Sequence, residues 1–353
     1  MRVAFVTMKT THDGDSAGGR RIERVARRLA DRGHDVTVLC SQWWDGYAES
    51  VTRDHVTYRA VTVSPSAPSF VARVPVLLAV HRPDVVHVRP DPPGVVRTAG
   101  IGRYLSRAPL VVEWFGDEAV GESDSAFEST VTLPDMVVTP SELVRTVVRE
   151  AGATAETTTV VPESIDTSLV ESVDPGESVD VVYAHPLDGT ANVEDLLLGL
   201  AELRDREWSA TVVGDGPKRA AYERQAGDLR IDDRIEFVGD VDRERRTAIY
   251  RGAHAFVQTA TRSYFPVEFL WALACGCVGI VEYQAGSSAH ELVENYERSF
   301  RVTDPPELAD AIVDAGEFDR LTEDDAWNEF DHDAVVDQYL DTYRTLVDAY
   351  GLF

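Results

Sequence analysis

The sequence predicts an α/β protein made of two doubly wound parallel-sheet domains. Short apolar runs rich in Val, Ile and Leu alternate with stretches in which apolar residues recur at helical spacing. The runs are apolar almost throughout, which is typical of parallel strands covered by helices on both faces. The pattern restarts after the polar segment "ESVDPGESVD" at 171–180, and 353 residues are enough for two domains of ordinary size.

The first half of the chain opens with the apolar strand "RVAFVT" at 2–7. A helix is expected at 18–32, because Ile22, Val25 and Leu29 lie on one helical face. Further strands are expected at 35–40, 55–61, 84–88, 109–114, 135–138 and 157–161. Helices are expected between them, for example at 93–106 and 141–151.

The second half repeats this alternation. Its strands are expected at 181–184, 209–214, 234–239, 254–259 and 278–282, and its helices at 192–206, 217–229, 243–252 and 266–275. We therefore place one Rossmann-like domain at 1–165, a second at 166–330 and a C-terminal amphipathic helix within 331–353. The two domains are expected to meet at a cleft near 163–178. Because ligands of such sheets bind beyond the carboxyl ends of the strands, two domains can hold two ligands.

The charge balance is strongly acidic. Asp and Glu number 61 against 34 Lys and Arg, for a net charge of −27, and Lys9 and Lys218 are the only lysines. Such a field argues against non-specific binding to nucleic acid. A carboxylate-rich, lysine-poor surface stays hydrated in concentrated salt, where charge repulsion is screened. We therefore expect a halophilic source and a protein that loses stability when salt is lowered.

The sequence predicts no membrane span, because it has no run of about 18 apolar residues. The apolar stretch at the N-terminus is too short for a signal peptide, so cytoplasmic residence is expected. The segment 68–83 is a mildly apolar helix with Arg73. Such a helix is more often part of a core than of a membrane face, so at most peripheral membrane contact is expected.

Several kinds of cofactor site are disfavoured. No G-x-G-x-x-G follows the first strand, which argues against NAD. "DGDSAG" resembles the start of a calcium loop, but the twelfth position, which needs a Glu, is Arg24. The three cysteines and the scattered histidines have no zinc-site spacing. No metal or redox cofactor is therefore expected.

Three loops have the composition of an anion-binding site. The segment 9–21 ends at a helix start with Gly18 and Gly19, where backbone N–H groups can hold a ligand, although a plain connector is the alternative. "GDG" at 214–216 is compatible with a phosphate neighbour or with a simple turn. In "GSSAHELV", at 286–293, two serines and a glutamate could cradle phosphate oxygens, form a helix capping box, or do both.

Seven segments resemble, in order, those of the glycosyltransferases of the GT-B fold in the large family-four group. They begin with "MRVAFVT…GGRRIERVARRLADRGHDVTVLC" and "RPDVVHVRP", and they end with "IEFVGDVDRERRTAIYRGAHAFVQTA" and "FLWALACGCVGIVEYQAGSSAHELV". The match covers nearly the whole chain, and its overall texture resembles that of halophilic archaeal members, in agreement with the charge. The resemblance implies a nucleotide-sugar donor in the second domain and an acceptor toward the first. It also implies retention at the anomeric carbon, no obligatory metal, and a C-terminal helix that returns to the first domain.

The chain departs from the family pattern at the expected donor site. The usual Arg and Lys near the diphosphate are replaced by His185 or Pro186 and by Ala191 or Asn192. The two glutamates, normally separated by seven residues, fall on Ser263 and Trp271. The histidine often found after "VVEW" aligns with Phe115 and is followed by "GDE" at 116–118. These changes predict a rearranged site.

Two carboxylates are assigned catalytic roles. Glu268 lies one helical turn before Trp271 and could accept hydrogen bonds from sugar or ribose hydroxyls, and Asp117 follows the altered histidine position. Glu268→Gln is therefore expected to keep the fold and to reduce transfer at least tenfold. The donor-binding residues are expected to be Gly18, Gly19, His185, Asn192, Gly214, Gly216, Phe265, Ser287, Ser288 and Glu291.

The expected function is transfer of a hexose from a nucleotide-sugar donor to a glycan or lipid-linked acceptor, for surface glycans or glycoproteins. The alternative is a catalytically impaired binding or scaffold subunit of the same fold. The missing cationic pair favours this alternative, and the glycine turns with Glu268 favour the enzyme. A nucleotide-sugar epimerase of related fold fits the architecture but not the ordered segments.

Overall fold

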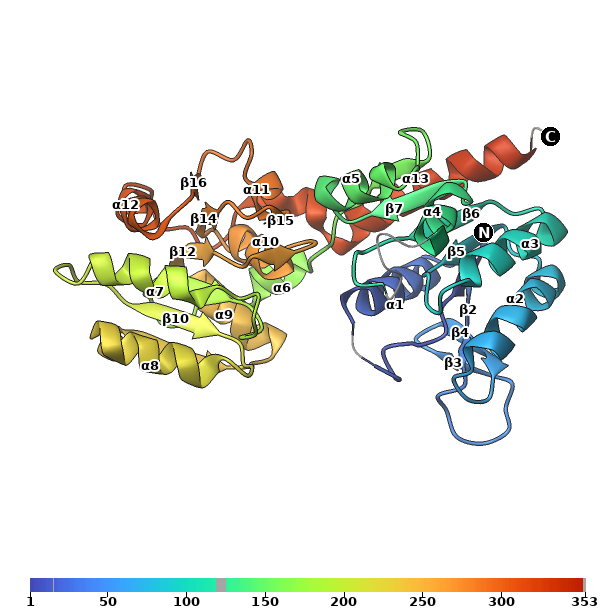
Figure 1. The fold of residues 1–353 in the computed structure, drawn as a ribbon, viewed down its shortest axis with the longest axis horizontal. Helices are drawn as coiled ribbons and strands as arrows, with labels where there is room; N and C mark the ends of the chain where they lie inside the picture. Colours follow the sequence, from blue (N-terminus) through green and yellow to red (C-terminus); the bar gives the residue numbers. More distant parts are fainter. Residues whose placement is uncertain (15, 119–124, 352–353) are drawn as a thin grey trace. The chain divides into compact units, whose positions relative to one another are not determined.

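The computed structural model describes residues 1–14, 16–118 and 125–351, which form two compact units (Figure 1). Unit 1 is Met1–Glu163 with Asp333–Phe353, and unit 2 is Ser164–His332. Each unit is built on a mainly parallel sheet covered by helices on both faces. The predicted fold class is therefore confirmed.

The sheet of unit 1 has eight strands in the order β3-β4-β2-β1-β5-β6-β7-β8. β3 pairs antiparallel with β4, and the other neighbours are parallel. The strands are β1 (Arg2–Val6), β2 (Asp35–Ser41), β3 (Ser50–Arg53), β4 (Val56–Thr62), β5 (Val85–Val88), β6 (Leu110–Glu113), β7 (Met136–Thr139) and β8 (Thr158–Val160).

Helices cover both faces of this sheet because its strands are apolar on both sides. Phe5 packs with α1 and α13, while its neighbour Val6 faces the opposite way and packs with α2 and α3. The helices of unit 1 are α1 (Ala17–Asp31), α2 (Ala67–His81), α3 (Val95–Ser106), α4 (Ser125–Thr132), α5 (Glu142–Glu150) and α13 (His332–Gly351). The C-terminal helix α13 thus contributes Val335, Tyr339 and Tyr343 to the core of unit 1.

The sheet of unit 2 has six parallel strands in the order β11-β10-β9-β12-β14-β16. They are β9 (Val179–Ala184), β10 (Ala210–Val213), β11 (Ile235–Gly239), β12 (Ala253–Gln258), β14 (Val278–Glu282) and β16 (Ser299–Val302). A separate two-stranded ribbon pairs β13 (Arg262–Ser263) with β15 (Gly286–Ser287).

One face of this sheet packs against α7, α8 and α12, and Phe256 on the other face contacts Phe269 of α10 and Tyr250 of α9. The helices of unit 2 are α6 (Thr167–Ser172), α7 (Val193–Glu202), α8 (Arg219–Leu229), α9 (Arg243–Gly252), α10 (Val267–Ala274), α11 (Ala289–Leu292) and α12 (Pro305–Ala315).

Several elements were not predicted from the sequence. β3 contains a single apolar residue, and β13 and β15 have two residues each, so none of them has a readable period. α12 did have a signal, since Asp304 caps it and prolines occupy its first turn. In the part of the chain that the structure describes, no helix is long and apolar enough to cross a bilayer.

Candidate functional site

In each sheet the connections reverse direction at one strand, and ligands of doubly wound sheets bind beyond that strand's carboxyl end. In unit 1 this strand is β1, which lies between β2 and β5. In unit 2 it is β9, which lies between β10 and β12. The loops that follow these two strands are therefore the places to look for functional side chains.

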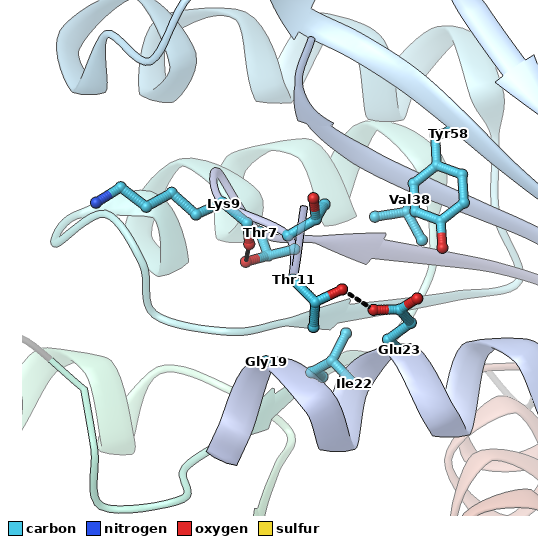
Figure 2. Close-up of a pocket in the computed structure, with 9 residues that line it drawn as sticks. Thr7, Lys9, Thr11, Gly19, Ile22, Glu23, Val38 and Tyr58 are labelled. Carbon is cyan, nitrogen blue, oxygen red and sulfur yellow. Dashed lines mark hydrogen bonds between the residues drawn. The ribbon is translucent and has the colours of Figure 1, made fainter. Parts of the chain in front are cut away.

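A small pocket lies beyond β1, between the loop that follows this strand and the start of α1 (Figure 2). Its free volume is about 10 Å³, room for one water molecule or one hydroxyl group. The Thr11 hydroxyl donates a hydrogen bond to the Glu23 carboxylate inside it. The pocket is lined by Thr7, Lys9, Thr10, Thr11, Gly19, Ile22, Glu23, Val38 and Tyr58. Gly19, predicted to bind the donor, thus forms part of the wall, and its N–H donates to Ser16 Oγ at 3.1 Å.

Gly18 and Asp117, which are 99 residues apart, meet at the N-terminus of α1. The Gly18 N–H donates to Asp117 Oδ2 at 3.1 Å, and Arg89 Nη2 donates to Asp117 Oδ1 at 3.1 Å. A Cβ on Gly18 would lie 2.8 Å from Asp117 Oδ1, so the glycine is needed for this close approach. A carboxylate is favoured at a helix N-terminus by the helix dipole.

Arg89 and Glu118 complete this group and were not predicted. Glu118 accepts hydrogen bonds from the N–H groups of Phe115 and Gly116 at 2.8 and 2.7 Å. Loss of solvent, and then the charge of Asp117, raise the pKa of Glu118 to about 7. The one sequence feature that could have identified Arg89 is its position directly after the strand at 84–88.

In unit 2 the glycine turn after β10 packs against the loop after β9. Gly214 has φ of +128°, and a Cβ there would lie 2.1 Å from the carbonyl oxygen of His185. A Cβ on Gly216 would lie 2.4 Å from the carbonyl oxygen of Leu187. The structure thus explains both glycines by the close approach of two loops, which is the simple-turn alternative, and no phosphate neighbour is needed to account for them.

Asn192 lies at the start of α7 in the left-handed conformation, with φ of 49°. Its Nδ2 lies 2.8 Å from Asp195 Oδ2, 3.2 Å from Glu282 Oε2 and 3.2 Å from the carbonyl oxygen of Thr259. An amide has two N–H groups for these three acceptors. At or next to the position where the resemblance implies a lysine, this chain therefore has the Asn192 amide, which lies between the carboxyl groups of Asp195 and Glu282. Among the described residues no hydrogen bond joins Asn192 to His185, whose Nδ1 lies 2.9 Å from the carbonyl oxygen of Pro186.

Glu282 was not predicted as a site residue, although it ends the apolar strand β14 at the carboxyl edge. It is 5% exposed, and Gln284 Nε2 donates to its Oε1 at 3.0 Å. Burial, and then the charge of Asp195, raise the pKa of Glu282 to about 8. Glu282 is therefore largely protonated at neutral pH and can act as a hydrogen-bond donor there.

The raised pKa of Glu282 makes stability depend on pH. Because the folded state holds this proton more tightly than the unfolded state, stability falls as pH rises from about 5 to about 9. Glu282→Gln mimics the protonated acid, so we expect the variant to lose less stability than the parent over this range. Thermal unfolding at several pH values measures the difference. The exposed Glu236→Gln is the control, and parallel curves for the parent and Glu282→Gln would contradict the expectation.

Glu268 is placed against α9 by four hydrogen bonds. Arg243 donates from Nη1 to Oε2 at 2.9 Å and from Nη2 to Oε1 at 2.8 Å. Arg246 Nη1 donates to Oε1 at 2.9 Å, and the Tyr250 hydroxyl donates to Oε2 at 2.7 Å. Burial by itself would raise the pKa of Glu268, but the two arginines and Tyr250 outweigh it and lower the pKa.

These partners occupy all four lone-pair positions of the Glu268 carboxylate, so none is left for a sugar hydroxyl. Trp271 belongs to the same cluster, because the Arg243 guanidinium lies 4.7 Å from the centre of its ring and Trp271 is 5% exposed. In this structure Glu268 joins α10 to α9, and its catalytic role stays a prediction. The geometry also gives Trp271 a packing role in a cation–π contact.

The loop "GSSAHELV" is tied to the backbone of residues 263 and 264. The Ser288 N–H donates to the carbonyl oxygen of Ser263 at 2.9 Å, and the Ser288 hydroxyl donates to that of Tyr264 at 2.9 Å. The Ser288 side chain makes no capping hydrogen bond to α11, so the Ser288 half of the capping-box alternative is not formed. Ser287 and Phe265 are also buried, and Glu291 lies in the four-residue helix α11.

Metal ligands do not gather in the described ranges: no group of three or more His, Cys, Asp and Glu side chains has the geometry to hold a metal ion there. Free Cys40, Cys275 and Cys277 are all buried.

Two family models match the chain. Residues 18–169 match the model described as Glycosyltransferase Family 4, and residues 178–317 match the model described as Glycosyl transferases group 1. Among curated protein sequences, none matches the chain.

Solved structures of the same fold are similar over the whole chain. HepE from Anabaena, in complex with UDP, has a TM-score of 0.75 at 19% identity and covers 98% of this chain and 100% of its own. A glycosyltransferase from Rickettsia africae has a TM-score of 0.79 at 15% identity, with 98% of each chain covered. Sucrose-phosphate synthase from Thermosynechococcus elongatus has a TM-score of 0.71 at 17% identity and covers 99% of this chain and 100% of its own.

The two matched models lie in order along the chain, and each falls largely within one of the two parallel-sheet units. The protein is therefore a glycosyltransferase of the GT-B fold.

Proposed function

We propose that this glycosyltransferase moves a hexose from a nucleotide-diphosphate sugar to a glycan or lipid-linked acceptor, with retention at the anomeric carbon, in the biosynthesis of surface glycans or glycoproteins. The observation that carries the proposal is that each unit has polar side chains at the reversal strand of its own sheet. The donor is assigned to unit 2 and the acceptor to unit 1. HepE, which spans the same fold, has been solved with UDP and also with UDP-glucose.

In this proposal the bond between the anomeric carbon and the diphosphate oxygen breaks, and the diphosphate leaves with the electron pair. The acceptor oxygen bonds to the same face of the anomeric carbon, and its proton passes to the departing diphosphate oxygen. The site must stabilise a departing diphosphate and an oxocarbenium-like sugar. His185 and Asn192, beyond β9, are assigned to the donor, together with Phe265, Ser287, Ser288 and Glu291. Because Ser287 and Ser288 are buried, the backbone of their loop is the better candidate for phosphate contact.

On the acceptor side, the proposal uses the pocket beyond β1 and the group formed by Gly18, Arg89 and Asp117. The pocket has room for one hydroxyl beside Glu23, whose carboxylate already accepts from Thr11. Asp117 is assigned the catalytic role in this group. Its position at the start of α1 leaves it half-buried, so it can reach a polar ligand.

A specific observation favours the alternative of a binding or scaffold subunit. The carboxylate of Glu268, one turn before Trp271, accepts hydrogen bonds from Arg243 and Arg246 of α9. The positions where the family has Arg and Lys are occupied by neutral or weakly basic residues. Loss of fixed cations could remove several kcal/mol of transition-state stabilisation. In this alternative the protein binds a nucleotide sugar without turning it over.

A nucleotide-sugar screen separates the two. Thermal unfolding is followed in concentrated salt with UDP, UDP-glucose and other nucleotide sugars, and nucleotide release is measured in the same mixtures. We expect one donor to raise the unfolding temperature and to be turned over, and Asn192→Ala to weaken that shift, while the exposed Leu198→Ser does not. Stabilisation without release would favour the binding subunit, and no stabilisation by any nucleotide sugar would contradict both.

We also propose a halophilic archaeal source, on the basis of the net charge of −27 and the scarcity of lysine. Thermal unfolding in dilute buffer and in concentrated KCl tests this proposal. A protein equally stable in both would not support it.

A further inference from the structure

Two neighbouring helices of unit 1 differ in composition from the rest of the chain. Asp and Glu make up 61 of the 353 residues, yet α2 and α3, with 15 and 12 residues, contain none. Every other α-helix in the described ranges has at least one. α2 and α3 lie side by side on one face of the sheet (Figure 1). The two helices thus supply no carboxylate of their own to the surface of a very acidic protein, and Asp135, which pairs with Arg103 of α3, comes from outside them.

The outward sides of both helices are apolar. On α2, Phe70, Val74 and Leu78 are buried, while Val76 and Val80, on the opposite side, are 63% and 68% exposed. On α3, the exposed side chains follow one helical face and include Ile101, Tyr104 and Leu105. We call the set Arg73, Val76, Val80, Arg97, Ile101, Tyr104, Leu105 and Arg107 the α2–α3 face. Its members come from two helices that contact each other, and soluble monomers rarely expose a large apolar patch without a partner.

The helices pack closely enough to act as one surface. A Cβ on Gly102 would lie 2.7 Å from Leu78 Cδ1 and 3.2 Å from Pro75 Cα, so the glycine lets α3 approach α2. Leu133, which is 36% exposed, lies against Gly100 of α3 and extends the apolar area.

The arginines of the α2–α3 face carry uncompensated charge. Arg73 donates to the carbonyl oxygen of Val61 and Arg97 donates to the Ser129 hydroxyl, each at 3.1 Å. In the part of the chain that the structure describes, neither they nor Arg107 has a carboxylate within ion-pair distance. Most other arginines whose contacts are described have a carboxylate partner, such as Arg103 with Asp135 at 2.6 Å.

We propose that the α2–α3 face docks on an anionic lipid bilayer. Exposed Val, Ile and Leu side chains enter the interfacial region, Tyr104 lies at its polar boundary, and the arginines reach the lipid phosphates. The rest of the protein is repelled by the same surface, so this face is the one presented to it. At high salt the screening length is only a few ångströms, and these local charges then decide the contact.

A second copy of the chain fits this face less well. Two copies placed face to face would bring their arginines together, with no carboxylate on α2 or α3 to pair with them. The sequence-based expectation of core packing for 68–83 holds for only one side of this helix. Its two apolar sides are opposite each other, so the helix does not have the one-sided pattern of an amphipathic helix.

The test is vesicle flotation of the full chain, in the lowest salt at which circular dichroism shows it folded. Vesicles contain phosphatidylcholine alone or with phosphatidylglycerol. We expect at least tenfold stronger binding to the vesicles with phosphatidylglycerol. The apolar variant Val76→Ser/Ile101→Ser/Leu105→Ser and the charge variant Arg73→Gln/Arg97→Gln should each reduce it at least tenfold.

Matched controls come from exposed positions of unit 2, with Leu198→Ser/Tyr283→Ser for the apolar variant and Arg224→Gln for the charge variant. Absence of binding, or equal loss in the controls, overturns the proposal. A dimer in light scattering that the apolar variant abolishes, without vesicle binding, assigns the face to a second copy. Binding of polyglutamate that depends on the same arginines, without vesicle binding, assigns it to an acidic protein. The assay uses no nucleotide sugar, so its result does not depend on the proposed function.

Discussion

Replacing Glu113 by glutamine is expected to lower the free energy of unfolding by about 3 to 5 kcal/mol. Glu113 ends β6 in the core of unit 1, and its side chain is 1% exposed. It accepts hydrogen bonds from Arg21 Nε at 2.7 Å and from the Tyr339 hydroxyl at 2.8 Å. His87 Nε2 lies 3.2 Å from Glu113 Oε2, the oxygen that also accepts from Tyr339. Glutamine keeps the shape but leaves the buried Arg21 guanidinium without its closest counter-charge.

The same cluster holds the C-terminal helix in place. Tyr339 and Tyr343 come from α13, and the Tyr343 hydroxyl lies 2.5 Å from His87 Nδ1. Tyr343→Phe, which removes the hydrogen bond between Tyr343 and His87, is the matched control. It is expected to lower the free energy of unfolding by about 1 kcal/mol. Denaturant unfolding of the three proteins gives both values. A loss below about 1 kcal/mol for Glu113→Gln would show that the arginine finds other partners.

The Glu113 cluster also predicts that the fold loses stability at acid pH. Burial alone would raise the pKa of Glu113, but the charge of Arg21, the nearby His87 ring and the hydrogen bond from Tyr339 hold the pKa below its ordinary value. Since the folded pKa is lowered, the stabilisation is fully present above the ordinary pKa of about 4.5 and is lost as pH falls through the folded value. The glutamine variant should lack this part of the acid dependence.

Replacing Glu268 by glutamine is expected to destabilise unit 2 by about 2 to 4 kcal/mol. The carboxylate is 16% exposed, and Arg243, at 36%, is exposed enough for solvent to weaken the pair below the fully buried case. At a temperature where parent and variant are both folded, we expect transfer to change by less than about threefold, because the carboxylate has no lone pair free for a donor.

Thermal unfolding and transfer kinetics on the same samples test this prediction. Trp271→Phe is the control, since it keeps a ring under Arg243 and leaves the four hydrogen bonds of Glu268 intact. If Glu268→Gln lowers transfer at least tenfold without a loss of stability, Glu268 binds the donor, as the sequence pattern indicated. If both fall together, the cluster positions residues of the donor site through α10.

The sequence by itself determined the fold class. Apolar runs such as "RVAFVT" and "VGIVE" are strands that must be covered on both faces, and helical spacing at Ile22, Val25 and Leu29 identifies their covering helices. These signals are local, so they can be read without knowing which segments meet. Polar residues at strand ends, such as Asn192, were found in the same way.

Only the tertiary structure decided what those polar residues touch. Gly18, Arg89 and Asp117 come from three separate segments, and nothing in the spacing indicates that they meet. Gly214 and Gly216 have the composition of a phosphate loop, but the backbone of His185 and Leu187 takes up the space beside them. The sequence indicated Glu268 as a ligand for a sugar, whereas the structure shows four hydrogen-bond donors from α9 around it. A carboxylate or a glycine has the same local signature whether its partner is a ligand or a distant part of the chain, and long-range packing settles which of the two it is.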